Sequence, residues 1–99
     1  MKYRRRSATI EAFRYIGDFI DYNGNICIPD WAMSLRRNGI IAVENHEGLK
    51  FPYKLHIKTP EGIKEANVGD YIVKDTSGIT HPCSPDIFEY TYELVDKED

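Results

Sequence analysis

Two side chains in the last third of the sequence, His81 and Cys83, are of types that bind metals or carry out nucleophilic chemistry. A zinc site needs about four ligands. The other candidate ligands are Cys27, His46 and His56, and their spacings match no zinc pattern. An activated thiol usually meets its base across the fold, whereas alternate residues of a strand share a face about 7 Å apart. We therefore predict no metal ligand, no cofactor and no catalytic residue.

Acidic residues supply a second kind of candidate chemistry. Glu61 and Glu65, and likewise Asp86 and Glu89, could form acid–base pairs. Carboxylates at turns and helix starts more commonly solvate or cap the chain, and no phosphate-binding glycine loop is present. Whether the protein is an enzyme stays open, and the balance favours a non-enzymatic protein. The enzymatic alternative is a small hydrolase or nucleotide-processing enzyme that uses Glu61, Asp70 and Asp86.

Aromatic and polar residues suggest binding instead of catalysis. Tyrosines and Trp31, with a lysine nearby, could form a stacking platform for a base or a surface for a protein partner, although a tyrosine-rich core would use the same residues. Asp70 could bond a ligand at a sheet edge, or accept backbone N–H groups across its own turn. The predicted ligand-binding residues are Trp31, Glu61, Asp70, Tyr71, Lys74 and His81.

Composition indicates one folded domain over residues 1–99, with 41% hydrophobic and 29% charged residues. A chain of this size forms a deep pocket only at an edge or between subunits, so a homo-oligomer is one expectation. The net charge of −3 argues against general affinity for nucleic acid. Residues 1–14 are basic and residues 86–99 acidic, which predicts two solvated ends or two ends close together on one sheet. No apolar leader or membrane-spanning run is seen, which predicts reduced thiols.

Turn residues divide the first half of the chain. Residues 8–16 are rich in strand formers, and residues 17–25 carry the Gly, Asp and Asn of a turn. Residues 30–38 form the best helix candidate, because Pro29 and Asp30 suit its start and Gly39 suits a left-handed residue after its end. Residues 40–43 form a short apolar run typical of a buried strand.

Strand patterns dominate the second half. Residues 53–58 alternate between an apolar and a polar face, and Pro60 and Gly62 predict a hairpin from residues 55–59 to residues 63–66. Further turns at residues 67–70 and 75–78 predict that the next two strands continue a meander. Near residues 85–90 Ser84 and Pro85 favour helical turns, followed by an extended tail through Val95. We therefore predict a single α+β domain whose antiparallel sheet has five or six strands and could curve toward a barrel.

Several motifs at the two ends of the chain resemble those of a known group of proteins. These are Met1-Lys2-Tyr3-Arg4, Ile10-Glu11-Ala12-Phe13-Arg14, Ile57-x-Thr59-x-Glu61-Gly62, Gly69-Asp70-Tyr71-Ile72-x-Lys74 and Pro82-Cys83-x-Pro85-Asp86-Ile87-Phe88-Glu89-x-Thr91-Tyr92-Glu93. Together they resemble a family of small, uncharacterised bacteriophage and prophage proteins. Gly69-Asp70-Tyr71 is also similar to the motif of the PGDYG group, but Val68 and Ile72 depart from it.

The resemblance implies a phage or prophage origin and a setting in the cytoplasm of a bacterial host, and it implies no catalytic assignment. The residues favour a small non-enzymatic binding protein that engages a host protein or a small ligand. A minor virion or assembly component is a further alternative. No membrane partner is expected, and nucleic acid is not the favoured partner.

Overall fold

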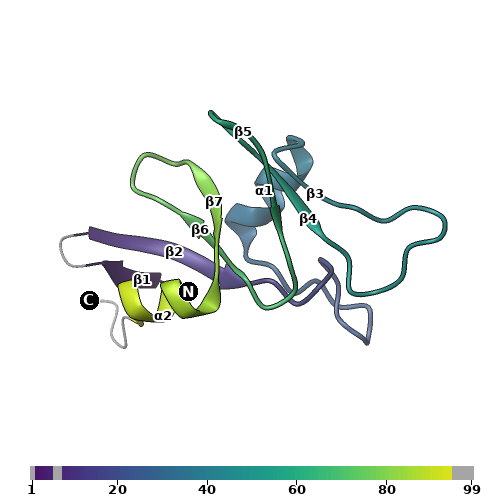
Figure 1. The fold of residues 1–99 in the computed structure, drawn as a ribbon, viewed down its shortest axis with the longest axis horizontal. Helices are drawn as coiled ribbons and strands as arrows, with labels where there is room; N and C mark the ends of the chain where they lie inside the picture. Colours follow the sequence, from purple (N-terminus) through teal and green to yellow (C-terminus); the bar gives the residue numbers. More distant parts are fainter. Residues whose placement is uncertain (1, 6–7, 95–99) are drawn as a thin grey trace.

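The sequence folds into two antiparallel sheets and two helices. The computed structural model describes the backbone of residues 2–5 and 8–94 and the side chains of residues 10–92. Within these residues the elements are β1 (Lys2–Arg5), β2 (Ala8–Arg14), α1 (Asp30–Arg37), β3 (Ile41–Val43), β4 (Leu55–Thr59), β5 (Gly62–Ala66), β6 (Tyr71–Lys74), β7 (Thr80–Cys83), α2 (Pro85–Thr91) and β8 (Glu93–Leu94). Figure 1 shows the three-stranded sheet beside the five-stranded one, with the segment between β3 and β4 extending outward.

The larger sheet has the strand order β7-β6-β2-β1-β8. Its central pair is β2 with β6, in register from Glu11 opposite Lys74 to Arg14 opposite Tyr71. Strand β8 forms one edge of this sheet and pairs with β1, where Arg4 lies opposite Glu93. The basic and acidic ends of the chain are therefore neighbours on one sheet, which is one of the two arrangements that their charges predict.

The smaller sheet has the order β3-β4-β5 and one covered face. Leu55 and Ile57 of β4 are fully buried, whereas Lys54 and Lys58 are exposed and His56 is half-buried. This confirms the dry and wet faces that the alternation predicts. The predicted hairpin is also confirmed, because Thr59 lies opposite Gly62 and the Thr59 hydroxyl donates to the Gly62 carbonyl at 2.7 Å.

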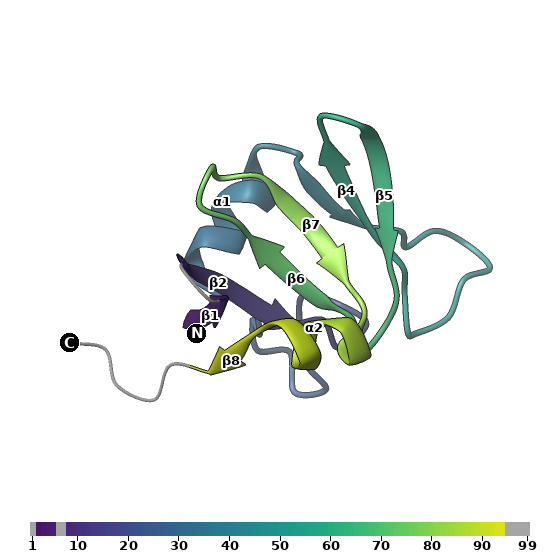
Figure 2. The ribbon, with the colours of Figure 1, turned by 60° about the vertical axis from the view of Figure 1, so that its left-hand side comes forward.

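Each helix covers a different face of the five-stranded sheet (Figure 2). Ala32 of α1 is buried in a core with Phe13 and Ile72, and this core continues into the inner face of the smaller sheet. Phe88 of α2 is buried against the opposite face, in a second core with Ile10, Ala12 and Val73. The larger sheet is thus covered on both faces.

Local chemistry accounts for the helix boundaries. Asp30 lies in the first turn of α1 and two arginines lie in its last turn, which complements the helix dipole. Gly39 follows with φ +74°, and the next amide, that of Ile40, donates to the Leu35 carbonyl at 2.9 Å. In α2, Ser84 precedes Pro85 at the first helical position. The predicted helix at residues 30–38 and the predicted helical turns near residues 85–90 are confirmed, and Val95 of the predicted tail lies outside the described residues.

One glycine is required by close packing. Gly17 has φ +107°, and a Cβ placed there would lie 2.7 Å from Pro52 Cβ. The Tyr53 amide donates to the Gly17 carbonyl at 2.9 Å. Gly17 therefore joins the end of β2 to the segment that leads into β4.

The α+β class and the antiparallel sheets are confirmed, but the strands form two sheets instead of one continuous meander. The turn at residues 67–70 does not fold β6 back onto β5. Instead the Gly69 amide donates to the Tyr15 carbonyl, and the Tyr15 amide donates to the Asp70 carbonyl, both at 2.8 Å. These bonds extend the pairing of β6 with β2, so the two hairpins lie in separate sheets, which do not close into a barrel. No helix in the described part of the chain is long and apolar enough to cross a membrane.

Candidate functional site

Trp31 and Lys74 lie together on the face of the larger sheet that α1 covers. The Lys74 ammonium lies 5.2 Å from the centroid of the Trp31 ring and 3.6 Å from a Glu11 carboxylate oxygen. The indole also lies against Phe13, with ring centroids 5.6 Å apart. The indole is half-buried and edge-packed, so it contributes more to the core than to an open stacking platform.

Tyr71 and His81 lie on the opposite face of the same sheet. The Tyr71 ring is stacked on Phe88 at 3.8 Å, and the Arg14 guanidinium lies 5.4 Å from its centroid. His81 is half-buried on β7, opposite Val73. Because the sheet separates this face from Trp31 and Lys74, the predicted binding residues do not converge on one surface.

Asp70 and Glu61 occupy two turns at opposite ends of β5. A carboxylate oxygen of Asp70 accepts the Asn67 amide at 2.9 Å, which confirms the predicted turn role of Asp70. Glu61 precedes β5 and is exposed. The five residues of β5 span roughly 16 Å between the two turns, so these carboxyl groups belong to opposite ends of the strand.

The two thiols lie in unreactive surroundings. Burial raises the pKa of Cys27, with Asp21 and Asp18 adding to the effect, and the thiol donates to the Phe19 carbonyl at 3.2 Å. Burial also raises the pKa of Cys83, with a smaller contribution from Asp70. A raised pKa lowers the thiolate fraction on which nucleophilic attack depends. Neither cysteine has the environment of a nucleophile.

A group of exposed apolar side chains, not predicted from the sequence, forms the most distinctive open surface. Ile16, Ile20 and Ile26 come from the loop after β2, and Phe51 comes from the segment before β4. We refer to Ile16, Ile20, Tyr22, Ile26 and Phe51 as the apolar surface. The signal in the sequence is that Ile20 and Ile26 lie among or beside the turn residues 17–25, where no helix or strand period accounts for them.

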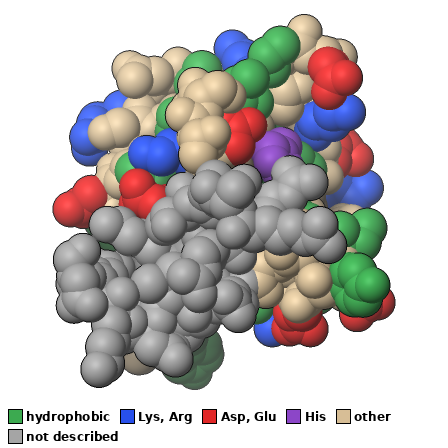
Figure 3. All heavy atoms as spheres, turned by 90° about the vertical axis from the view of Figure 1, so that its left-hand side faces the viewer, with side chains coloured by type: hydrophobic (Ala, Val, Ile, Leu, Met, Phe, Trp, Pro, Cys, Tyr) green, Lys and Arg blue, Asp and Glu red, His purple; other side chains and the backbone are tan. Residues whose placement is uncertain are grey.

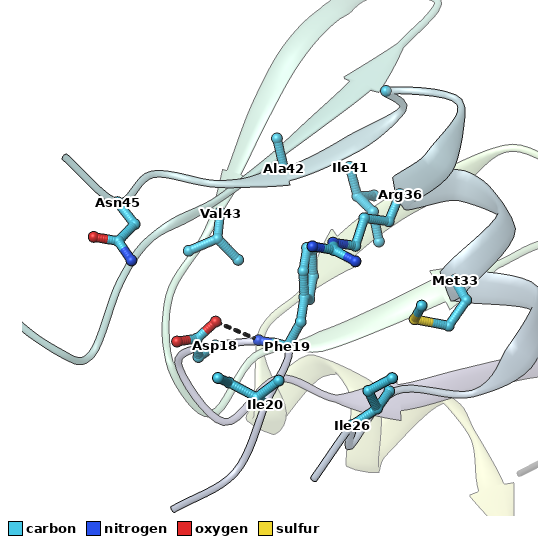
Figure 4. Close-up of a pocket in the computed structure, with 11 residues that line it drawn as sticks. Asp18, Phe19, Ile20, Ile26, Met33, Arg36, Ile41, Ala42, Val43 and Asn45 are labelled. Atoms are coloured by element: carbon cyan, nitrogen blue, oxygen red, sulfur yellow. Dashed lines mark hydrogen bonds between the residues drawn. The ribbon is translucent and has the colours of Figure 1, made fainter. Parts of the chain in front are cut away.

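Two recesses open on the apolar surface and share Asp18 and Ile20. The larger has a volume of about 430 Å³ and lies between the loop after β2, the end of α1 and β3. Figure 4 shows Ile20 and Ile26 on one side of this recess and Arg36 and Val43 on others. The smaller, of about 230 Å³, is lined by Ile16, Ile20, Tyr22 and Phe51, with Asp18 and Asp21 as its charged groups.

Asp18 and Asp21 at these recesses stabilise the loop by accepting hydrogen bonds from backbone amides. One oxygen of Asp21 accepts the amides of Asn23 and Asn25, both at 2.9 Å, and an oxygen of Asp18 accepts the Phe19 amide at 2.7 Å. An isolated bridge pairs Ile20 with Ile26. These hydrogen bonds define the conformation of the loop, in which Ile20 and Ile26 are exposed.

The outer face of the smaller sheet carries a polar cluster of Glu44, His56 and Glu65, which we call the His–carboxylate cluster. The His56 Nε2 lies 2.6 Å from Glu44 Oε1 and 3.9 Å from Glu65 Oε2. The hydrogen bond from His56 is the main cause that lowers the pKa of Glu44. Sequence spacing could not reveal this cluster, because its members come from β4, from β5 and from the residue that follows β3.

Among the described side chains, both signs of charge occur on the face seen from the side of β1 and α2. In Figure 3 the described Lys and Arg side chains there are interspersed with Asp and Glu, without a basic area.

Comparisons of the chain with protein-family models, with curated proteins and with solved structures found no significant match. The resemblance to phage and prophage proteins therefore stays a prediction, and the functional argument depends on the geometry.

Proposed function

We propose that this chain is a small non-enzymatic binding protein of phage or prophage origin that captures a protein partner in the cytoplasm of a bacterial host. The motifs at the two ends of the chain support the origin and the setting. The observation that carries the binding role is the apolar surface with its two neighbouring recesses. Apolar groups gathered on a surface and rimmed by polar ones typically mark an interaction site.

The shape of the surface favours a segment of a protein over a small molecule. The smaller recess, at about 230 Å³, is below the size usual for small-ligand pockets, whereas the larger, at about 430 Å³, is within it. Because Asp18 and Ile20 line both recesses, the recesses are neighbours, and side chains of one partner segment could enter both. Residues buried at the centre of such an interface supply most of the binding energy.

The charges on the surface specify the partner further. Asp18 and Asp21 are the charged groups that line the smaller recess. An apolar side chain that enters this recess would bring its neighbours close to two carboxylates. The partner segment should therefore carry a bulky apolar residue next to a lysine or arginine, since complementary charge selects the partner and speeds association.

An enzymatic role has less support from the geometry. The acids proposed for it lie on separate elements, with Glu61 and Asp70 at opposite ends of β5 and Asp86 in the first turn of α2. A minor virion or assembly component would be the same binding function with a phage structural protein as the partner.

The test selects peptides from a displayed random library against the purified chain and measures their affinity for two matched variants. Ile26→Asp changes the apolar surface, and Ile63→Asp changes an isoleucine of nearly equal exposure on β5, at 61% and 65% respectively. We expect selected peptides to pair an apolar residue with a basic one, and to lose at least tenfold in affinity for Ile26→Asp alone. Equal affinity for both variants, or no enrichment, would contradict the proposal.

Two further outcomes would identify a different occupant. Native mass spectrometry of the protein from lysogenic or infected cells would reveal a retained small molecule. Sedimentation of the wild type and of Ile26→Asp would reveal a self-associated state that depends on the apolar surface. Either result would replace the proposed partner with a small ligand or a second copy of the chain.

A further inference from the structure

We propose that the His–carboxylate cluster, together with His46, binds one zinc-like divalent cation on the outer face of the three-stranded sheet. This site is separate from the apolar surface and does not depend on the binding function proposed above. It would bring together residues from β4, from β5 and from the segment that follows β3.

Strand pairing places the three members of the cluster on one face. His56 lies directly opposite Glu65 in the pairing of β4 with β5. On the other side of β4, His56 lies opposite Ala42, and Glu44 follows two residues later on the same face. The Glu44 amide donates to the Lys54 carbonyl at 2.8 Å, which continues this ladder past β3. The backbone therefore positions the side chains before any ion binds.

The distances fit a small coordination sphere. One ligand atom from each of Glu44, His56 and Glu65 lies within 4.8 Å of the others. Zinc binds nitrogen and oxygen at about 2.0 to 2.2 Å, so neighbouring ligand atoms of a tetrahedral site are about 3.3 Å apart. The spacings of 2.6 and 3.9 Å around His56 Nε2 lie on either side of that value. Small rotations of exposed side chains would bring them to it.

His46 lies beside the cluster, on the other oxygen of Glu44, and a movement of its side chain would supply a fourth ligand atom to the three that lie within 4.8 Å of one another. Its Nε2 lies 3.6 Å from Glu44 Oε2, and its Nδ1 lies 3.1 Å from the Glu47 carbonyl. In the neutral ring, an Nδ1–H that donates to this carbonyl leaves a lone pair on Nε2. Histidines that bind metals usually donate their other ring N–H in this way. A lone pair and a carboxylate facing each other at this distance are a pair that a cation would bridge.

The donor set indicates the class of metal. Two imidazoles and two carboxylates suit Zn²⁺ and neighbouring transition metals, whereas Mg²⁺ and Ca²⁺ prefer oxygen ligands alone. To bind, the cation replaces the His56–Glu44 hydrogen bond, and the proton on His56 Nε2 moves to Nδ1 or is lost to solvent.

One group opposes the cation. The Lys54 ammonium lies 3.6 Å from Glu65 Oε1, so it shares a carboxylate with the proposed site. Its charge would repel a bound cation. Removal of this charge should therefore strengthen binding, a change that a purely structural role of the cluster does not predict.

The test titrates the purified full-length chain with ZnCl₂ by calorimetry and with CoCl₂ by visible absorption. We expect one equivalent of Zn²⁺, an intense four-coordinate Co²⁺ spectrum, and no uptake of MgCl₂. His56→Ala should weaken Zn²⁺ binding at least tenfold, and His81→Ala, a half-buried histidine on β7, should leave it unchanged. Lys54→Gln should tighten binding severalfold, whereas Lys58→Gln, further along β4, should have a smaller effect.

Folding stability gives a second readout of the same site. The urea midpoint of His56→Ala should lie slightly below that of the wild type without metal, because the variant loses the bond to Glu44. The gap should widen with Zn²⁺, because a ligand stabilises only the state that binds it. Zinc uptake that persists in His56→Ala, or that disappears in Cys27→Ser or Cys83→Ser, would overturn the proposal. A failure here would leave the selection of peptides by the apolar surface unaffected.

Discussion

The two sheets of this protein use alternating strands in different ways. The five-stranded sheet is covered on both faces, by α1 on one and by α2 on the other, so its Tyr71 and Cys83 are partners in packing. The three-stranded sheet is covered on one face, and its outer face holds the His–carboxylate cluster. In the five-stranded sheet, side chains that could carry out chemistry are packed against a core. In the three-stranded sheet they remain available to solvent and ligands.

The largest expected effect comes from removing the cover of the second face of the larger sheet. Phe88 is 2% exposed and packs between Tyr71 and Tyr92, so Phe88→Ala should cost about 3 to 5 kcal/mol of unfolding free energy. Urea denaturation followed by circular dichroism would measure the loss. Ile63→Thr, on the open face of the smaller sheet, should change stability by less than about 0.5 kcal/mol. Similar losses for the two variants would contradict the difference between the sheets.

The next effect tests the link between the sheets. The buried Tyr15 follows β2, and its hydroxyl donates to the Tyr53 carbonyl at 2.8 Å, just before β4. Burial raises the pKa of this phenol far above its usual value, with Asp18 as a smaller cause. Tyr15→Phe should cost about 1 to 3 kcal/mol, because it leaves a carbonyl without its partner. Tyr22→Phe, on an exposed tyrosine, is the matched control and should have no measurable effect in the same denaturation experiment.

A smaller effect, with a pH signature, comes from the turn that joins β6 to β7. One oxygen of Asp75 accepts bonds from the Ser77 hydroxyl at 2.6 Å and from the amides of Ser77 and Ile79. The Ser77 hydroxyl bond is the main cause that holds the pKa of Asp75 below its usual range. Asp75→Ala should cost about 1 kcal/mol at neutral pH.

The pH dependence of that loss follows from the direction of the shift. A carboxyl group with a lowered pKa in the folded state stabilises the protein above its unfolded pKa, near 3.9, and loses this contribution as the pH falls through its folded pKa. The difference in stability between wild type and Asp75→Ala should therefore shrink below about pH 4. Urea titrations at pH 7 and at pH 3 would measure it. A constant difference would indicate that the bonds do not depend on the charge of Asp75.

The smallest effect tests a polar contact at the end of β6 in the five-stranded sheet. Lys74 contacts Glu11 and the face of Trp31. Lys74→Met keeps an unbranched apolar stem and removes the ammonium group, so we expect a loss of about 0.5 kcal/mol, the usual scale of such partly exposed contacts. Added salt should reduce the difference between the two proteins. A loss above about 2 kcal/mol would place Lys74 among the core residues instead.

Local patterns could predict a large part of the fold. Helix α1 carries its own start and stop residues from Pro29 to Gly39, and the β4–β5 hairpin is specified by Pro60 and Gly62 together with the alternation before them. These signals act over a few residues. The split of the hairpins into two sheets could not be read in the same way, because it depends on backbone bonds between Tyr15 and the distant turn at residues 67–70.

The candidate sites show the same limit. Each predicted binding residue was chosen for its chemistry, yet Trp31 and Tyr71 ended on opposite faces of one sheet, and Glu61 and Asp70 at opposite ends of one strand. The His–carboxylate cluster and the apolar surface gather residues that no spacing rule connects.

By itself the sequence determined the segments that become helix, strand and turn, because capping, alternation and turn preferences act between near neighbours. Only the tertiary structure decided which faces are covered and which side chains meet, because that depends on pairing between strands far apart in the chain. His56 is a surface residue of one strand in the sequence and the centre of the proposed coordination sphere in the fold.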